Sequence, residues 1–181
     1  GQGGLGLPNK NYYFDKDERS SGIRDEYKNH VGKIFSMVYG GPVEGAMPAT
    51  YGIEEELASK SWPPAQMRDI EAQYNKMTIA DLSTLAPGFD WAGYFSARNI
   101  QVDSVIVGQK DFFTKFANVY ANSSIDSWKS YLKWNVLNAS ASSLNMDMER
   151  ANFAFYSTVM RGTQKMKPLW KRGVMTVSRS P

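Results

Sequence analysis

Apolar residues recur every three or four positions along most of the chain, a spacing typical of helices with one buried face. The first such stripe follows Asp15 or Asp17, either of which can cap a helix, and it stops at Gly40, Gly41 and Pro42. Its apolar positions are Ile23, Tyr27, Val31, Ile34, Phe35 and Val38. We therefore predict one long helix in this part of the chain.

The same spacing predicts helices in most of the second half. Thr78 and Asp90 can each cap a short helix, and Ser123 or Ser124 can cap the longest one. Asn145 or Asp147 begins another helix, which ends at Gly162. The expected helices run from 79 to before Pro87, from 91 to about 97, from 111 to 120, from 123 or 124 to at least 139, from 145 or 147 to 162, and from 169 to about 177. The inward positions expected in the longest helix are Ile125, Trp128, Leu132, Val136 and Ala139.

The pattern is weaker between residues 42 and 62, because Gly45, Pro48 and Gly52 interrupt it. We expect only a short helix or two there, with Ile53 and Leu57 facing inward. This segment also contains three consecutive acids, Glu54, Glu55 and Glu56. Neighbouring helical positions point about 100° apart, so three such carboxylates cannot converge on a metal ion or a proton. We interpret them as a solvated face.

Only two segments are predicted to be extended. The run of Val102, Val105, Ile106 and Val107 resembles a strand. It needs a partner, which we expect to be the first ten residues or a part of the protein outside this sequence. The run 4–13 alternates leucine with glycine and contains Pro8, so it predicts a docked strand or loop. The predicted fold is mainly α, a multi-helix lobe with one or two short strands, in a single domain spanning residues 1–181.

Composition excludes several classes of function. The 181 residues are 42% apolar and 13% aromatic, enough for a real core. A net charge of only +3 does not indicate a nucleic-acid surface, so no nucleic-acid partner is predicted. No apolar run approaches the roughly 20 residues of a membrane helix, so no membrane segment is predicted. The basic cluster near the end is interpreted as a solvated face: Lys165, Lys167, Lys171 and Arg172.

Catalytic and metal chemistry has few candidates. There is no cysteine, so neither a thiolate nucleophile nor a Cys-ligated metal is possible. The one histidine, His30, cannot supply the two imidazoles of a His-Glu-x-x-His zinc site. We predict no catalytic residue, metal ligand or cofactor in this chain, and a packed or surface role for His30. We interpret the aromatic groups at helical spacing as core residues and not as a base-stacking platform: Phe112, Phe113, Phe116, Trp128, Tyr131 and Trp134.

The opening run, Gly4-Leu5-Gly6-Leu7-Pro8 followed by Tyr12-Tyr13, resembles the Gly-Leu-x-Leu-Pro-x-x-x-Tyr-Tyr stretch of neprilysin-family zinc metallopeptidases. Further similar motifs follow in family order across nearly the whole chain: Ile23-Arg24-x-x-Tyr27, Leu57-Ala58, Arg68-Asp69, Tyr74-Asn75-Lys76-Met77-Thr78, Pro87-Gly88-Phe89-Asp90-Trp91, Ser130-Tyr131-Leu132-x-Trp134, Asn152-Phe153-x-Phe155-Tyr156, Gly162-Thr163 and Pro168-x-Trp170-Lys171-Arg172. Two positions depart from the family pattern. Gly173 stands where animal members commonly carry a disulfide cysteine, which fits a bacterial relative that lacks this bridge. Pro48 interrupts a region that is usually helical in the family.

The resemblance implies part of the N-terminal helical lobe, which faces a thermolysin-like catalytic lobe across an enclosed chamber. The family's zinc helix, its further Glu ligand and its Asn-Ala-Tyr substrate-binding segment come later in the polypeptide. The implied parent reaction is hydrolysis of small peptides by a zinc-activated water, with the helical lobe limiting access by size. This chain would then be wall and gate, inactive alone, with zinc in the parent enzyme and the catalytic lobe and peptide substrates as partners.

The resemblance also implies an extracytoplasmic location: periplasmic, secreted or surface-anchored. An alternative from a different class is a stand-alone helical domain that binds a peptide or protein without catalysis. Four residues are candidates for an ordered polar network: Arg68, Asp69, Tyr74 and Asn75. The family-signature positions are Gly6, Leu7, Pro8, Tyr12, Tyr13, Trp170 and Arg172.

Overall fold

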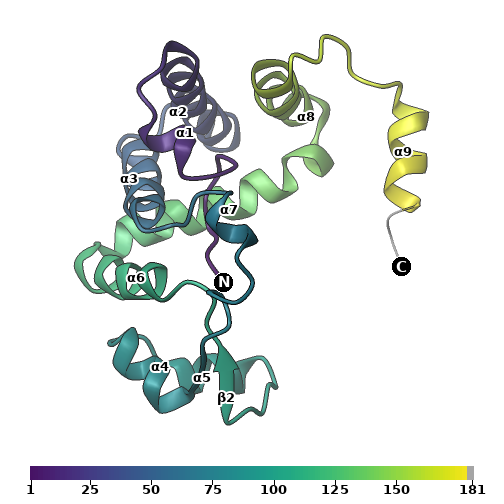
Figure 1. Cartoon of the computed structure of the whole chain (residues 1–181). Coiled ribbons are helices and arrows are strands. Elements are labelled where there is room, and N and C mark those ends of the chain that lie inside the picture. The colour runs from purple at the N-terminus through teal and green to yellow at the C-terminus, as the bar shows by residue number, and fades with distance from the viewer. Residues whose placement is uncertain (179–181) are drawn as a thin grey trace.

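The computed structural model describes residues 1–178, and the last three residues of the predicted domain lie outside this range (Figure 1). The chain is mainly helical, as predicted. In the first half lie α1 (Asn11–Phe14), α2 (Glu18–Tyr39), α3 (Ala46–Ser59), the 3-10 turn η1 (Gln66–Arg68), β1 (Lys76–Thr78), α4 (Ile79–Leu85) and α5 (Trp91–Ala97). In the second half lie β2 (Ser104–Ile106), α6 (Lys110–Asn122), α7 (Ile125–Leu144), α8 (Met146–Phe153), the π-helical turn η2 (Ala154–Val159) and α9 (Leu169–Val177).

Most helices begin where a capping side chain was predicted. The Asp17 side chain accepts a hydrogen bond from the Ser20 backbone N–H at 2.9 Å and so caps α2. Thr78 and Asp81 form a reciprocal capping box at the start of α4. The caps of α5, α7 and α8 are Asp90, Ser124 and Asn145, respectively. These caps fix the boundaries of helices whose interiors the apolar spacing had indicated.

The segment after Pro42 is more regular than the short helix or two that we predicted. It forms a single helix, α3, of 14 residues, and Ile53 and Leu57 are buried as expected. Pro48 is the third residue of this helix. A proline is tolerated there because the first backbone N–H groups of a helix have no intrahelical acceptor. The helical spacing from Thr50 to Ala58 therefore outweighed the glycines and the proline.

The predicted strand exists as β2, but its expected partner within the chain was wrong. It pairs antiparallel with β1, with Met77 opposite Val105. The ladder is extended by a hydrogen bond from Val107 N to Asn75 O at 2.9 Å. With Met77 as its one apolar residue, β1 has no strand-like pattern of its own, and only the packing of α4 and β2 together identifies it. The first ten residues form the docked loop that was also predicted.

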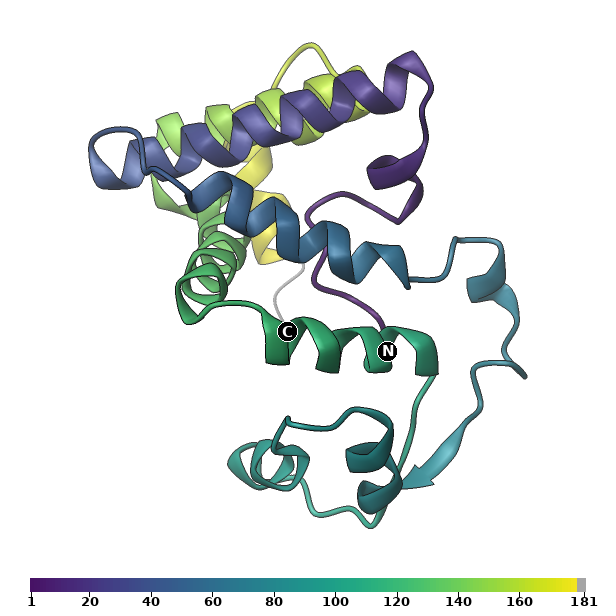
Figure 2. The ribbon, with the colours of Figure 1, turned by 90° about the vertical axis from the view of Figure 1, so that its left-hand side faces the viewer.

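Three contiguous apolar clusters form the interior. The largest joins α2, α3, α7, α8 and η2 around Tyr27, Phe35 and Trp134. A second links α3, α6 and α7, and a third packs α4 and α5 against β2 and α6. Figure 2 shows α2 and α3 stacked above α6, with the two short helices α4 and α5 below. The opening segment runs past α3 and ends beside the start of α6, where Gln2 N donates to Gln109 Oε1 at 2.8 Å.

The predicted inward face of α7 was largely wrong. Ile125, Leu132 and Val136 are 74%, 57% and 65% exposed. The buried residues are Tyr131, Trp134 and Ala141 instead. Apolar and aromatic side chains lie around most of the circumference of α7, so spacing alone does not show which face is buried. Among the residues that the structure describes, no helix is both long and apolar enough to cross a membrane.

Candidate binding cavity and buried polar centre

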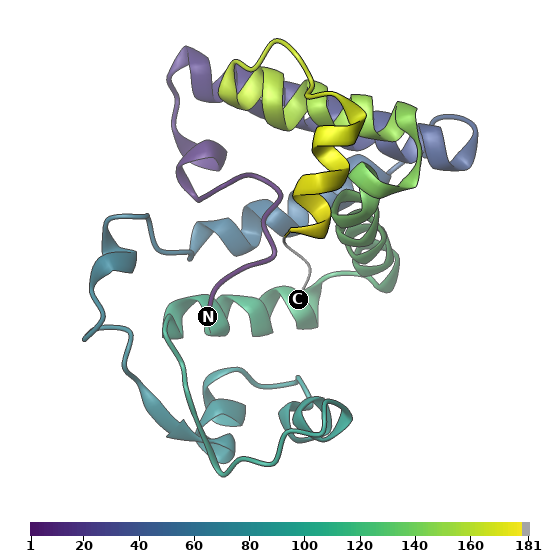
Figure 3. The ribbon, with the colours of Figure 1, turned by 90° about the vertical axis from the view of Figure 1, so that its right-hand side faces the viewer.

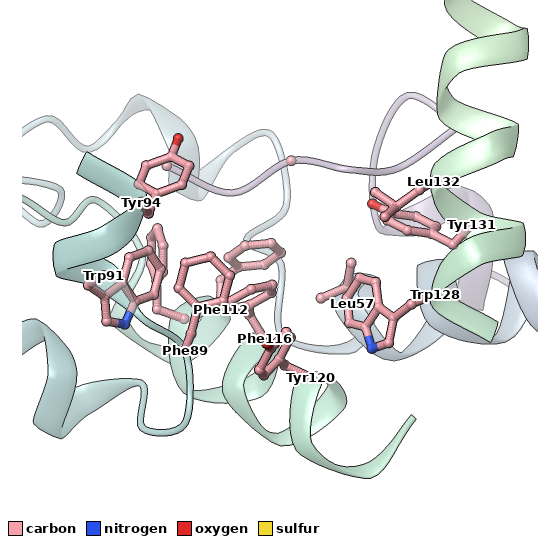
Figure 4. Close-up of a pocket in the computed structure, with 13 residues that line it drawn as sticks. Leu57, Phe89, Trp91, Tyr94, Phe112, Phe116, Tyr120, Trp128, Tyr131 and Leu132 are labelled. Atoms are coloured by element: carbon pink, nitrogen blue, oxygen red, sulfur yellow. The ribbon is translucent and has the colours of Figure 1, made fainter. Parts of the chain in front are cut away.

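A cavity of about 520 Å³ opens between the α4–α5 layer and the α3, α6 and α7 helices. Aromatic rings form most of its wall, and no charged side chain lines it (Figure 4). The lining residues are Gly1, Gly3, Leu57, Phe89, Trp91, Tyr94, Phe112, Phe113, Phe116, Tyr120, Trp128, Tyr131 and Leu132. Ligand sites in proteins are often apolar hollows of this size. The chemistry of the wall suits an apolar or aromatic group and offers no general acid or base.

The rings of the wall pack against one another edge to face. Phe89 lies 5.3 Å from Phe116, and Trp128 lies 5.5 Å from Tyr131, between ring centroids. The predicted core role is therefore confirmed for the buried rings of Phe112, Tyr131 and Trp134. Phe113, Phe116 and Trp128 are only partly buried and face the cavity. The same aromatic cluster thus serves as core on one side and as cavity wall on the other.

Beside this cavity, α3 places a carboxylate in the centre of the molecule. Glu54 is 0% exposed. The Tyr13 hydroxyl donates to Glu54 Oε2 at 2.8 Å, and the Tyr27 hydroxyl donates to both carboxylate oxygens at 2.8 Å. Trp134 Nε1 in turn donates to the Tyr27 hydroxyl oxygen at 2.9 Å. Four elements, α1, α2, α3 and α7, therefore meet in one hydrogen-bonded network that we call the Glu54 centre.

The interpretation of Glu54 as part of a solvated face was wrong, although Glu55 and Glu56 are exposed. The sequence carries a signal that identifies it. Thr50, Tyr51, Glu54 and Ala58 follow helical spacing and are all buried, so Glu54 is a polar residue within an otherwise inward stripe. Treating the three acids as one run concealed this.

Burial raises the pKa of the Glu54 carboxyl to about 7, against the opposing effect of hydrogen bonds from Tyr13 and Tyr27. Burial, with the nearby Glu54 charge, also raises the pKa values of the Tyr13 and Tyr27 hydroxyls. The predicted packed role of His30 is confirmed, because it is 5% exposed and stacks on Phe155 at 5.1 Å. Burial, with Lys33 nearby, lowers the pKa of His30 to about 4.

Hydrogen bonds to tyrosine hydroxyls hold the backbone of the opening segment at and around the Glu54 centre. Leu7 is 1% exposed, and its backbone N–H donates to the Tyr13 hydroxyl oxygen at 3.2 Å. The carbonyl oxygen of Gly6 accepts from the Tyr156 hydroxyl at 3.1 Å, and that of Gly4 accepts from the Tyr131 hydroxyl at 2.8 Å. The signature positions Gly6, Leu7 and Tyr13 therefore lie in this centre. The other two in the opening run, Pro8 and Tyr12, are exposed and partly buried, respectively.

The structure places the predicted polar residues on the surface loop between α3 and β1. The Asp69 side chain accepts from Ala72 N, and Asn75 Nδ2 donates to Ala72 O, both at 2.9 Å. Arg68 and Tyr74 are exposed beside them, and none of the four lines the aromatic cavity. At the other end of the chain, Trp170 is 67% exposed. Arg172 forms an ion pair with Glu149, so it differs from the three exposed lysines of the basic cluster.

Residues 1–178 do not fit a metal ion, since nowhere among them do three or more His, Asp or Glu side chains gather in a suitable group. The described residues provide a helical scaffold with a docked opening segment, an apolar cavity and a buried carboxylate.

Comparison with known proteins gives this scaffold a class. The chain is similar to Mycobacterium tuberculosis zinc metalloprotease Zmp1 in complex with inhibitor, with a TM-score of 0.89 and 30% identity over 98% of this chain and 28% of that one. The open state of Zmp1 matches equally well, with a TM-score of 0.89. Endothelin-converting enzyme 1 from Rattus norvegicus is 29% identical over 179 residues, which are 94% of this chain and 23% of that enzyme. The fold is that of the N-terminal region of a zinc metallopeptidase.

The family model described as Peptidase family M13 matches residues 1–180. The chain belongs to peptidase family M13, and the resemblance to neprilysin-type enzymes is confirmed. It spans about a quarter of the length of the relatives that it matches.

Proposed function

We propose that residues 1–181 form part of the non-catalytic helical lobe of a zinc metalloendopeptidase that cleaves small peptides. In this proposal the lobe is a wall and gate of the substrate chamber, and a catalytic lobe of the same polypeptide supplies the zinc site. The reaction is peptide hydrolysis by a zinc-activated water. The chain by itself is inactive. By analogy with the family, the whole protein acts outside the cytoplasm.

One observation carries this proposal: nearly the whole chain matches a zinc metalloprotease, yet it covers only 28% of that protein's length. With a single histidine, residues 1–181 cannot build a His-Glu-x-x-His zinc site. The chemical step therefore requires other residues of the polypeptide. A similar structure is described as an open state, which supports a gating role for movement between lobes.

The test uses the protein that the natural gene encodes. We expect bound zinc by elemental analysis, and hydrolysis of a short fluorogenic peptide that a chelator abolishes and added zinc restores. A size-limited chamber predicts that the same peptide sequence, placed in a loop of a large folded protein, resists cleavage. A gene product without zinc or peptidase activity would leave the stand-alone binding domain as the better account. Equal cleavage of the peptide and the folded protein would contradict the gate.

A paired substitution tests whether the aromatic cavity faces the chamber. Leu132 lines this cavity and is 57% exposed, whereas Ile70 is 81% exposed and lies outside it. Replacing either residue by lysine should leave the core intact, because both side chains are exposed. We expect Leu132→Lys to lower kcat/KM for apolar peptides severalfold and Ile70→Lys to leave it unchanged. Equal values for both variants would remove this cavity from the chamber wall.

A further inference from the structure

The Glu54 centre has a property that peptide hydrolysis in another lobe does not use: it contains a fully buried carboxyl group whose hydrogen-bond donors are all neutral. The phenols of Tyr13 and Tyr27 donate to it directly, the Trp134 indole donates to the Tyr27 phenol, and the Gly6 backbone N–H contributes a further hydrogen bond. An ionised carboxylate without a cationic partner is unfavourable in an apolar interior. Hydrogen bonds from neutral donors compensate only in part.

The opening segment is the lid over this carboxyl group. Gly6 passes so close to the Tyr27 hydroxyl that a Cβ at this position would overlap it. Leu7 is buried next to it, with its N–H on the Tyr13 hydroxyl. If residues 4–8 lift away, the Tyr13 hydroxyl loses the hydrogen bond from Leu7 N–H and water can reach Glu54. The hydration of Glu54 therefore depends on whether this segment is docked.

The titratable groups around Glu54 come from every element that packs against it. They are Tyr13 of α1, Tyr27 of α2, Tyr131 of α7, Tyr156 of η2 and Tyr51 of α3 itself. Burial raises the pKa of each of these hydroxyls, so all five remain neutral near pH 7. His30 of α2 also stays neutral there, because its pKa is lowered to about 4. Glu54 is thus the group of this centre that changes charge near neutral pH.

We propose that Glu54 couples docking of the opening segment to proton uptake. Docking excludes water, so the carboxyl takes one proton from solvent, and release of the segment returns that proton. A tyrosine hydroxyl both donates and accepts, so Tyr13 and Tyr27 can bond to either form of the carboxyl. The raised pKa of Glu54 in the docked state supports this direction. A group whose pKa is raised by docking favours the docked form at low pH and loses that effect as the pH rises to the docked value.

The coupling reaches the aromatic cavity, because the same segment forms part of its wall. Gly1 and Gly3 line the cavity, and Gly4 O holds the Tyr131 hydroxyl at 2.8 Å. Tyr131 is itself a lining residue. Loosening of residues 4–8 therefore changes the wall of the cavity as well as the Glu54 centre. The shape of the cavity should therefore depend on pH, whether or not the protein has the proposed peptidase function.

Hydrogen exchange on the protein that the natural gene encodes tests this inference. We expect the protection factor of peptides covering residues 4–8, corrected for the intrinsic exchange rate, to fall by up to about tenfold per pH unit as the pH rises toward 7. Above the docked pKa of about 7, the protection factor should level off. Protection that does not change between pH 5 and 9 would overturn the proposal.

Three variants identify the titrating group. Glu54→Gln should remove the pH dependence, because an amide does not titrate, whereas His30→Gln should retain it. Tyr13→Phe removes a donor that favours the charged form, so it should move the midpoint to higher pH even though docking is weaker throughout. If Glu54→Gln does not fold, the pH midpoint of protection in Tyr13→Phe tests whether Glu54 is the titrating group. A pH dependence that persists in Glu54→Gln, or an unmoved midpoint in Tyr13→Phe, would show that Glu54 is not the group.

Discussion

The opening segment and α9 both carry positions that were predicted from the sequence as family signatures, but the rest of the chain holds them very differently. The opening segment passes through the centre of the fold, with Leu7 1% exposed and Gly4 and Gly6 held by tyrosine hydroxyls. In contrast, α9 stands off from the helices of the main body in Figure 1, and in the view of Figure 3 it lies in front of them. Its apolar residues Leu169 and Val174 are 65% and 58% exposed.

A position predicted as a family signature therefore need not belong to this chain's own core. The opening segment stabilises residues 1–178 directly, through burial and through the Glu54 centre. An ion pair between Arg172 and Glu149 joins α9 to α8, while the apolar residues Leu169, Val174 and Val177 of α9 are mostly exposed. We therefore expect changes at the two sites to differ sharply in their effect on stability.

The largest effect is expected from a matched pair of leucines. Leu7→Ala removes a fully buried side chain and leaves a cavity, so it should lower the free energy of unfolding by about 2–5 kcal/mol. Leu169→Ala removes a side chain that is 65% exposed and should change it by less than about 0.5 kcal/mol. Urea denaturation followed by circular dichroism measures both. Equal losses would mean that α9 is as well packed as the opening segment.

A smaller effect is expected from a pair of glycines within the opening segment. Gly6→Ala places a methyl group against the Tyr27 hydroxyl, so we expect a loss of about 3 kcal/mol from overpacking. Gly3→Ala is the control, since a Cβ there has no neighbour within 4 Å. The midpoint of urea unfolding should fall for the first variant and stay unchanged for the second. An unchanged midpoint for Gly6→Ala would show that the segment can shift away from Tyr27 without loss.

The stability of the region beneath the opening segment should depend on pH through two buried groups, Glu54 and His30. Their contributions to the free energy of unfolding change in opposite directions as the pH rises. The folded pKa of Glu54, about 7, lies above its ordinary value of 4.5, so its contribution falls as the pH rises. The folded pKa of His30, about 4, lies below its ordinary value of 6.5, so its contribution rises with pH. Between pH 4.5 and 6.5 the two slopes oppose each other and should nearly cancel.

Single substitutions should reveal each slope. In His30→Gln, the free energy of unfolding should decrease by about 1.4 kcal/mol per pH unit as the pH rises through this window. In Glu54→Gln it should increase by a similar amount. Urea denaturation of both variants and the unaltered protein at several pH values provides the measurement. Slopes of the same sign in the two variants would contradict the assignment.

The sequence predicts most of this fold because helix boundaries depend on local chemistry. Five helices are capped by side-chain hydrogen bonds to the N–H group three positions ahead, and such short-range contacts can be predicted from sequence: the caps are Asp17, Thr78, Asp90, Ser124 and Asn145. The docked opening segment was also predictable from its glycines and leucines. Features that depend on residues close together in the sequence were therefore predicted correctly.

Contacts between distant parts of the chain were not predicted from the sequence pattern. The buried face of α7 depends on which neighbours it meets, and Trp134 faces inward because Tyr27, 107 residues away, accepts its N–H. The partner of β2 depends on how α4 and β1 pack, and β1 has no pattern of its own. Glu54 is buried because tyrosines from α1 and α2 reach it. Each of these outcomes depends on contacts between distant parts of the chain, which periodicity does not contain.

The smallest effect is expected at the exposed signature residue of α9. Trp170 is 67% exposed, so Trp170→Ala should change the free energy of unfolding of residues 1–181 by less than about 0.5 kcal/mol. In the natural gene product, by contrast, a catalytic lobe that covers α9 would bury this ring, and the same substitution should then lower the unfolding midpoint clearly. Urea denaturation of Trp170→Ala in both contexts measures the difference, with Leu7→Ala as the control that destabilises both. If Trp170→Ala is neutral in both, α9 has no partner elsewhere in the polypeptide, and its signature residue must be explained in another way.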